Sequence, residues 1–336
     1  MLKTIRFLVV ICAALSARAS ELQKFAFEKA EMGVPFQITI FAEKESDASA
    51  AADAAFTRIE ALNAIFSDYE DDSELTKLSQ SSGAGNAVKV SDELWIVLSR
   101  AQQLAVRTDG AFDVTCGPLT SVWRRARRKK ELPAPELIEE MRARVGFQKM
   151  RLDEKQHTAE LLAPQMRLDL GSIAKGYACD EAMRILKKNG FPISLVAAGG
   201  DTVAGDAPPG RKGWRIEVAA LDADGGATGR APTIIEVANM AISTSGDRFQ
   251  KLEAGGKRYS HILDPRTGQP LTDHNLATVI ARDGLTAGIS TACSVLGPAQ
   301  GLKLVAEWKA AALFQRQPAE NVEVTESPGW ADWLLK

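Results

Sequence analysis

Several patterns that mark common protein classes are absent from this chain of 336 residues. It has four cysteines and three histidines, and their spacing fits no zinc motif. The sequence has no Walker loop, no HExxH, no GxGxxG and no Ser-His-Asp order, which leaves hydrolase and standard nucleotide-fold assignments without support. After the N-terminal segment there is no apolar run of about 18 residues or more, so the sequence predicts no membrane span.

The N-terminus has the pattern of a secretory signal. Lys3 and Arg6 precede the apolar run Phe7 to Leu15, and Ala17-Arg18-Ala19 fits a small-x-small cleavage site. We therefore predict a signal peptide over residues 1–19 and a periplasmic or otherwise exported mature protein that begins at Ser20. A short buried N-terminal helix is the less favoured alternative.

The charge of the mature chain also limits its partners. The predicted signal peptide carries three basic residues and no acidic one, so its removal changes the formal net charge from −2 to −5. A mildly acidic protein lacks the overall basicity of a nucleic-acid binder. Ile11 precedes Cys12, where a lipid-anchored cysteine would follow a small residue. We expect no nucleic-acid partner and no lipid anchor.

Three cysteines remain after the predicted cleavage, namely Cys116, Cys179 and Cys293. An odd number allows at most one internal disulfide. Each lies beside or near a glycine motif, and export does not require thiols to pair, so we predict three buried thiols.

Apolar periodicity predicts interleaved helices and strands. Alternation predicts a strand over 36–41, and an alanine-rich segment with helical spacing predicts a helix over 50–65. Further helices are predicted at 94–106, 135–145 and 302–308, and further strands at 193–198, 214–218, 234–237 and 277–280. Several strands are too close together for helical crossovers. The sequence therefore predicts an α+β fold with mixed, largely antiparallel sheets and packed helices, rather than a doubly wound sheet.

The segment from Leu168 to Asp180 is the most informative motif. Leu168 to Leu170 is interpreted as the end of a strand, Gly171-Ser172 as a turn, and Ile173 as the start of a helix. Such a junction exposes helix N-terminal amides, which favour phosphate. Lys175 gains nothing from the helix dipole in the first turn. It either serves a ligand or is an ordinary surface lysine, and this segment alone leaves both interpretations open.

Other polar, glycine-containing clusters occur along the chain, and each of them alone is more typical of a turn. They are Phe66 to Leu75, Gly110 to Leu119, Ala198 to Asp201, Ser243 to Gly246 and Tyr259 to Gly268. Their number favours a shared ligand site, since strand-end glycines let a ligand approach the backbone. His261 is interpreted as a general base or as a residue that holds its turn. The basic run Arg124 to Lys130 is interpreted as a solvated helix end, with an acidic partner or anionic lipid as the alternative.

In this order the clusters resemble the FAD:protein FMN transferase family, the ApbE-like flavin transferases. The resemblance runs from about Met32 to about Leu313, which implies a single domain of this kind over residues 20–336 with its core at 32–313. It implies an α+β fold that holds FAD in a cleft between two subdomains. It also implies Mg²⁺-dependent transfer of FMN to a Thr or Ser hydroxyl of an acceptor protein, with release of AMP; a membrane redox-complex subunit is one possible acceptor.

The resemblance also assigns roles to single residues. It implies that FAD is contacted by Met32, Tyr69, Ala111, Phe112, Asp113, Asp169, Lys175 and Ile262. His261 matches the proposed general base that activates the acceptor hydroxyl. Ser172 matches a position whose backbone oxygen binds the metal, and Thr291 matches a metal-binding threonine. Mg²⁺ would neutralise charge on the leaving phosphate.

This chain departs from the family pattern at two positions. Ala287 stands where the family usually has an aspartate metal ligand, one helical turn before Thr291. Asp283 could replace that ligand only if its segment bends inward. Ser79 stands where the family often has an asparagine near the flavin. Two functions stay open: an exported flavin transferase, or a non-catalytic periplasmic FAD-binding protein or slow FAD pyrophosphatase.

Overall fold

The computed structural model describes residues 22–221, 233–247, 250–318 and 321–335. The predicted signal peptide at 1–19 lies outside these ranges. Within them, no helix combines the length and the apolar character needed to cross a membrane.

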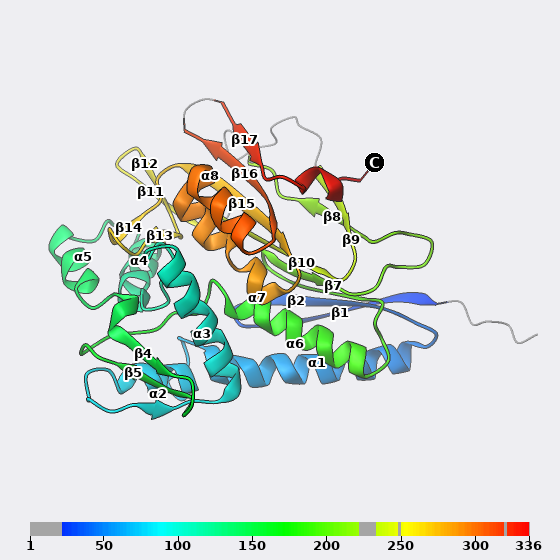
Figure 1. Cartoon of the computed structure of the whole chain (residues 1–336), viewed down its shortest axis with the longest axis horizontal. Coiled ribbons are helices and arrows are strands. Elements are labelled where there is room, and N and C mark those ends of the chain that lie inside the picture. Colours follow the sequence, from blue (N-terminus) through cyan, green and yellow to red (C-terminus); the bar gives the residue numbers. More distant parts are fainter. Residues whose placement is uncertain (1–21, 222–232, 248–249, 319–320, 336) are drawn as a thin grey trace, which may run out of the picture.

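A sheet of eight strands, antiparallel throughout, forms the centre of the molecule (Figure 1). Its strand order is β1-β2-β6-β7-β10-β15-β16-β17. These strands are β1 (Gln23–Glu31), β2 (Val34–Ala42), β6 (Ser194–Ala198), β7 (Asp201–Ala204), β10 (Met240–Gly246), β15 (His274–Ala281), β16 (Ala311–Gln317) and β17 (Glu323–Glu326). Successive side chains of β10 and β15 point to opposite faces of the sheet, so they lie alternately in two different hydrophobic cores.

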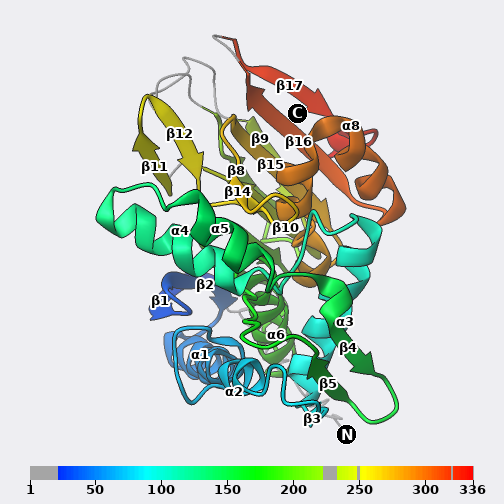
Figure 2. The ribbon, with the colours of Figure 1, turned by 90° about the vertical axis from the view of Figure 1, so that its left-hand side faces the viewer.

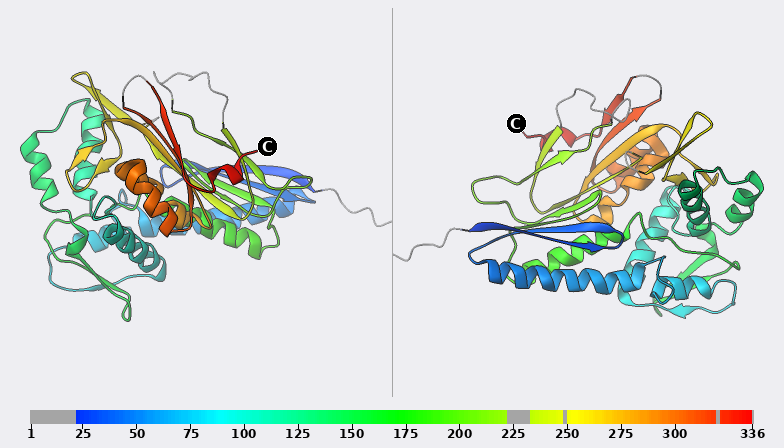
Figure 3. Two further views of the ribbon diagram at one scale, coloured as in Figure 1. Left: turned by 45° about the horizontal axis from the view of Figure 1, so that its top comes forward. Right: turned by 180° about the vertical axis from the view of Figure 1, so that it is seen from behind.

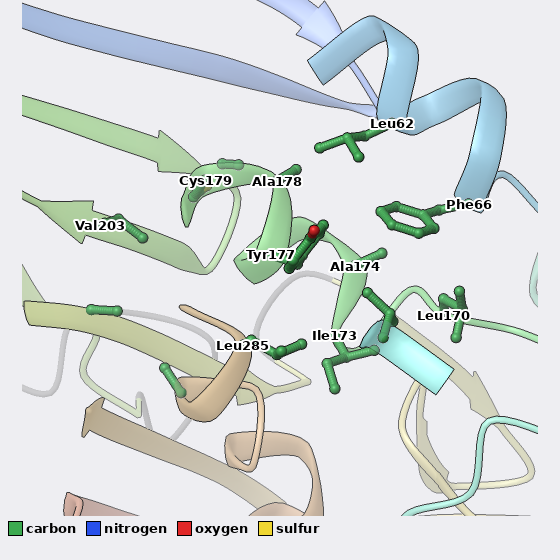
Figure 4. Packing of buried hydrophobic residues seen from close by; sticks show 14 of the residues in the cluster. Leu62, Phe66, Leu170, Ile173, Ala174, Tyr177, Ala178, Cys179, Val203 and Leu285 are labelled. Carbon is green, nitrogen blue, oxygen red and sulfur yellow. The ribbon is translucent and has the colours of Figure 1, made fainter. Parts of the chain in front are cut away.

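Four helices cover one face of this sheet. They are α1 (Glu45–Phe66), α6 (Ala174–Lys188), α7 (Gly284–Ala287) and α8 (Ser290–Glu307). Helices α1 and α6 pack on each other below β1 and β2, and α8 packs on β15 and β10 (Figures 1 and 3). Figure 4 shows Phe66 of α1 beside Tyr177 of α6; their rings lie 5.8 Å apart, edge to face. This packing fixes α6, which carries the Leu168 to Asp180 motif, against the sheet.

The opposite face is covered by the hairpin of β8 (Trp214–Val218) and β9 (Thr233–Val237), with the short helix η2 (Trp330–Trp333). Trp330 is fully buried there, and Trp214 packs edge to face on Phe41 with ring centres 5.8 Å apart. Large aromatic side chains therefore close this second core.

The remaining elements stand at one end of the sheet. Figure 2 shows α4 and α5 beside the β11–β12 hairpin. The helices are α2 (Glu74–Gln80), α3 (Asp92–Arg107), α4 (Gly117–Lys129), α5 (Pro135–Arg142) and η1 (Phe147–Lys149). The strands are β3 (Val88–Lys89), β4 (Met150–Asp153), β5 (Thr158–Leu161), β11 (Lys251–Ala254), β12 (Lys257–Ser260), β13 (Leu263–Asp264) and β14 (Gln269–Pro270).

The predicted fold class, α+β with largely antiparallel pairing, is confirmed. The helix predicted at 302–308 is the end of α8, which begins twelve residues earlier at Ser290. Gly297 has a φ of 67° and Pro298 follows it, so a kink interrupts the helical pattern there. Cys116, Cys179 and Cys293 are all unpaired; Cys179 and Cys293 are buried, and Cys116 is partly exposed.

Candidate active site

The segment before α6 is not a strand, contrary to the prediction for Leu168 to Leu170. Its amides bond to a side chain and a loop: Leu168 N donates to Ser79 Oγ at 3.1 Å, and Asp169 N donates to Val114 O at 2.8 Å. Asp169 Oδ1 then accepts the amide of Gly171 at 2.9 Å. Ser79 thus anchors the segment that presents Asp169, a role that its position in the sequence did not reveal.

Helices α6 and α7 touch backbone to backbone. A Cβ on Gly176 would lie 2.4 Å from the carbonyl oxygen of Gly284, so only glycine fits there. The Asp180 carboxylate accepts the amides of Gly284 at 2.7 Å and Leu285 at 2.9 Å. Burial raises the pKa of Asp180 to about 7. Two glycines and one aspartate therefore fasten the start of α7 to α6.

Arg124 of α4 joins two carboxylates from distant parts of the chain. Its Nη1 donates to Asp68 Oδ2, and its Nη2 donates to Asp169 Oδ2 at 2.7 Å. Its guanidinium also lies 4.6 Å from the ring centre of Tyr69, which is 72 % exposed. Burial raises the pKa of Asp68, and the nearby Asp169 adds to that effect while Arg124 opposes it. This contact brings the predicted site residues Tyr69 and Asp169 together.

Arg127 lies one turn after Arg124, so both face the same side of α4. Burial lowers the pKa of Arg127, and the positive charge of Arg124 lowers it further. Among the residues that the structure describes, no acidic side chain lies within ion-pair distance of Arg127. The interpretation of this basic run as a wholly solvated helix end is wrong for Arg124 and incomplete for Arg127. The i, i+3 spacing of the two arginines was the available signal.

His261 follows β12 directly and is half-buried. Its Nδ1 lies 3.2 Å from the carbonyl oxygen of Gln250, which can only accept, so Nδ1 carries the proton and Nε2 keeps a free lone pair. Burial lowers the pKa of His261 to about 4, and the charges of Arg127 and then Lys175 contribute. The imidazole is therefore neutral at pH 7, and it shares an electrostatic environment with Arg127 and Lys175.

Lys175 folds back over the turn that precedes it. Its Nζ donates to Gly171 O at 2.6 Å and lies 4.0 Å from Oδ2 of Asp201, the first residue of β7. Burial raises the pKa of Asp201, and the charge of Lys175 acts against that rise. The lysine thus stands between the Leu168 to Asp180 motif and the end of the sheet.

A chain of hydroxyl groups runs from Asp201 to Thr291. Ser243 Oγ donates to Asp201 Oδ1 at 2.7 Å and lies 2.9 Å from Ser290 Oγ. Ser245 Oγ continues the chain, at 2.9 Å from both Ser290 Oγ and Thr291 Oγ1. Strands β7 and β10 and helix α8 meet at this point, so the predicted ligand clusters at 198–201 and 243–246 join Thr291 in one polar network. Its partly exposed members, Ser245 and Thr291, form a polar surface.

The predicted metal ligands lie near this surface. The carbonyl oxygen of Ser172 would be 3.4 Å from a Cβ built on Gly288, close to the start of α8 and Thr291. Ala287 is fully buried and offers no oxygen. Asp283 caps α7, since its Oδ1 accepts the amide of Thr286 at 2.6 Å. No group of three or more His, Cys, Asp or Glu side chains is arranged for a metal among the described residues.

Three other predicted FAD contacts, Ala111 to Asp113, lie in a buried turn of their own. Ala111, Phe112 and Asp113 are buried, and Asp113 Oδ1 accepts both the amide and the hydroxyl of Thr115, at 2.8 and 2.7 Å. Burial raises the pKa of Asp113, although these bonds to Thr115 oppose it. That carboxylate therefore holds its own turn.

Met32 is half-buried and Ile262 is buried. Met32 occupies the left-handed turn between β1 and β2, with a φ of 49°. That turn leads into Val34, which lies within 3.7 Å of the position of a Cβ on Gly199. Ile262 is 6 % exposed and bonds through its amide to Ser260 Oγ at 3.0 Å. A ligand would therefore meet the segment at Ile262 mainly through its backbone.

Known proteins resemble the chain along nearly its whole length. A FAD:protein FMN transferase of Haemophilus influenzae is 32% identical over 97% of this chain and 96% of its own length. The protein of that name from Escherichia coli K12 is 28% identical over 83% of this chain and 80% of its own length. The flavin transferase ApbE from Vibrio cholerae superposes with a TM-score of 0.84 at 27% identity, covering 93% of this chain and 100% of that one. The apo flavinyl transferase ApbE of Pseudomonas stutzeri gives a TM-score of 0.80 at 30% identity, covering 93% of this chain and 97% of that one. The ApbE family model matches residues 32–314, and the chain belongs to the ApbE family.

Proposed function

We propose that this protein is a FAD:protein FMN transferase, which moves FMN from FAD to a Thr or Ser hydroxyl of an acceptor protein and releases AMP. The observation that carries the proposal is the state of His261. Its Nδ1 is held by Gln250 O, and its ring is kept neutral by burial and by the charges of Arg127 and Lys175, against a smaller opposing effect of Asp247. A base with that state is available at neutral pH. The names of the Haemophilus influenzae and Escherichia coli relatives support the same activity.

In the proposed reaction His261 Nε2 takes the proton of the acceptor hydroxyl. The hydroxyl oxygen then forms a bond to the FMN-side phosphorus, and the bond from that phosphorus to the bridging oxygen breaks. AMP leaves with the bridging oxygen. Lys175 and Arg127 supply positive charge near the developing negative charge, which stabilises a phosphoryl transition state.

The residues near Thr291 fit a hard cation in donor type, because the available donors are oxygens. Ser172 O and Thr291 Oγ1 would hold Mg²⁺ together with phosphate oxygens of FAD. A bound Mg²⁺ neutralises phosphate charge during such a transfer. Since Ala287 supplies no carboxylate, the protein contributes less charge to this site than a site with aspartate would.

FAD is placed along the polar surface between Tyr69, Lys175 and Thr291 in this proposal. Its cleft would lie between the large sheet and the part of the molecule that contains α4. Export is also part of the proposal, and it rests on the signal pattern at 1–19. The acceptor would then be a protein that meets this enzyme outside the cytoplasm.

A second function is favoured by one specific observation, the fully buried Ala287 in place of a carboxylate ligand. A weak metal site would leave a protein that binds FAD without transfer, or that hydrolyses it slowly to FMN and AMP.

One experiment separates these functions. The purified protein is incubated with FAD, Mg²⁺ and an extract of cells that lack the protein, and released AMP and covalent flavin fluorescence on denaturing gels are both measured. A transferase gives AMP and a fluorescent protein band, and His261→Ala abolishes both while FAD still binds. AMP without a labelled band indicates a pyrophosphatase, and bound FAD with neither product indicates a binding protein.

A further inference from the structure

A groove of about 510 Å³ runs between α4 and α5 (Figure 2 shows the two helices). Its apolar part includes Leu132 and Leu137, which are 46 % and 37 % exposed. Val122 and Met141 also line it. Exposed leucines at the side of a groove can bury apolar side chains of a partner.

The rim of this groove is positively charged. Arg125 and Lys129, one turn apart on α4, line it from one side, and Arg144 and Arg167 also contribute to its wall. Glu131 is the one acidic residue in the lining. Neither Arg125 nor Lys129 has an acidic side chain within ion-pair distance in the described ranges. Two cations without partners beside exposed leucines fit a segment that is both acidic and apolar.

The groove is connected to the candidate active site. Arg167 lines the groove, donates to the backbone oxygen of Asp68, and has its Nη2 3.8 Å from Asp68 Oδ2. Asp68 in turn pairs with Arg124 on the other face of α4. Helix α4 is therefore a common wall, with Arg124 turned to the site and Arg125 to the groove.

The same helix also reaches the segment around His261. Trp123 stacks on Tyr259 with ring centres 5.7 Å apart, and its Nε1 donates to Gly268 O at 2.9 Å. A chain segment that lies in the groove therefore contacts the helix that supports the proposed base.

We infer that this groove docks an acidic, leucine-containing segment of the acceptor protein, beside the hydroxyl that receives FMN. The inference rests on the proposed function, because only a transferase has an acceptor protein as its partner. A protein substrate must be held by more than the single hydroxyl that reacts, since specificity comes from contacts away from the reacting atoms. The unpaired cations of α4 supply charge recognition, and Leu132 and Leu137 supply apolar contact.

The test uses a fluorescein-labelled peptide of twelve residues made of Glu and Leu, with Gln/Leu and Lys/Leu peptides of the same length for comparison. Binding to the full protein is measured by fluorescence anisotropy. We expect the Glu/Leu peptide to bind best, and the double variant Arg125→Glu with Lys129→Glu to weaken it about tenfold. The matched control is Lys155→Glu with Lys188→Glu, which makes the same charge change on exposed lysines outside the groove and should leave binding unchanged.

A second variant, Leu132→Ser with Leu137→Ser, keeps the charge of the groove and should also weaken the binding of the Glu/Leu peptide. Equal binding of all three peptides, or equal loss in the matched control, would overturn the inference. A lipid result would also overturn it. If no peptide binds, and the wild type but not the groove variant cosediments with phosphatidylglycerol vesicles, the groove is a lipid site. FAD affinity is measured by calorimetry in parallel. Normal FAD binding without peptide binding rejects the groove alone, whereas absent FAD binding rejects the proposed function.

Discussion

Asp169 accepts a 2.7 Å hydrogen bond from Nη2 of Arg124, although the two residues lie 45 positions apart in the chain. The same guanidinium also pairs with Asp68, and each of the two carboxylates is only 7 % exposed. Arg124 is therefore shared by two buried anions, of which Asp68 also has Arg167 at 3.8 Å. Removal of a single partner from a buried pair leaves an uncompensated charge.

We predict that Arg124→Leu lowers the free energy of unfolding by about 3–5 kcal/mol at pH 7. The loss should be smaller at pH 5, because the pKa of Asp68 is already raised and would rise further without Arg124. Urea denaturation at both pH values measures this. Arg128→Leu, at an exposed position of the same helix, should stay within about 0.5 kcal/mol of wild type. Similar losses in both variants would contradict the bridging role.

Lys175→Met should raise the Kd for FAD about tenfold, since a hydrogen bond to a charged group contributes about 1.5–3 kcal/mol. The free energy of unfolding should fall by only about 1–2 kcal/mol, because Nζ donates one hydrogen bond, to the neutral Gly171 O, and lies 4.0 Å from the carboxylate of Asp201. Calorimetric titration and urea denaturation provide the two values. Lys175→Arg keeps the charge and serves as the control. Unchanged FAD affinity with a large loss of stability would make Lys175 a structural residue.

Ala287→Asp places a carboxylate at a fully buried position four residues before Thr291. We expect the variant to unfold at a lower temperature than wild type in EDTA, because an unpaired buried charge is costly. Mg²⁺ should restore part of that loss by binding the folded state. Thermal unfolding with and without Mg²⁺ tests this, and Ala287→Asn is the neutral control. A gain from Mg²⁺ that is equal in both variants would reject a metal site here.

The low pKa of His261 predicts an unusual pH dependence. The pKa of His261 is about 4 in the folded protein against an ordinary value of 6.5. Between these two pH values the histidine is therefore protonated in the unfolded chain and neutral in the folded protein. Stability contributed by this group is therefore complete above pH 6.5 and is lost as the pH falls toward 4. The transfer rate should likewise keep its full value down to about pH 5.

Arg127→Gln tests the source of this shift. Burial is the main cause, and Arg127 is the next, with Lys175 acting in the same direction and Asp247 against it. Loss of the Arg127 charge should move the pKa of His261 upward, so that the acid limb of the rate profile shifts to higher pH, although burial still keeps the pKa below its ordinary value. NMR titration of the His261 ring and the rate profile should agree. A limb that does not move would remove Arg127 from the environment of the base.

Gly176→Ala should destabilise the protein by about 1–3 kcal/mol, because its methyl group would overlap the carbonyl of Gly284. Gly284→Ala should do the same from the other side, since its Cβ would lie 2.2 Å from Gly176 O. Both changes push α6 and α7 apart, so the double variant should lose less than the sum of the single variants. Urea denaturation of the three variants gives this comparison, and strictly additive losses would show that the contact is not shared.

The sequence predicted the fold class and the strands of the sheet where apolar alternation was regular, as at 36–41 within β2. It did not predict that Leu168 to Leu170 is irregular, because the bonds that hold this segment come from Ser79 and Val114, far away in the chain. It also placed the start of α8 too late, since Gly297 and Pro298 interrupt the helical pattern.

For the candidate site, the sequence found the clusters but not the pairs that join them. The chain of hydroxyls from Asp201 to Thr291 depends on β10 lying between β7 and β15, and no local pattern contains that order. Arg124 was hidden among five neighbouring basic residues, and only the packing of α4 distinguishes it from them. The residue types of a cluster can be identified from one segment of the sequence, whereas the pairing of clusters across the sheet depends on the whole fold.

Strand β10 pairs with β7 on one side and β15 on the other, so the polar surface is complete only after residues as far as Thr291 have been made. A nascent chain that stops before Thr291 lacks part of this surface. A ligand that binds there recognises the finished molecule alone and shifts the balance away from unfolded forms that proteases remove. Bound ligand should therefore raise the free energy of unfolding by an amount that grows with the ligand concentration.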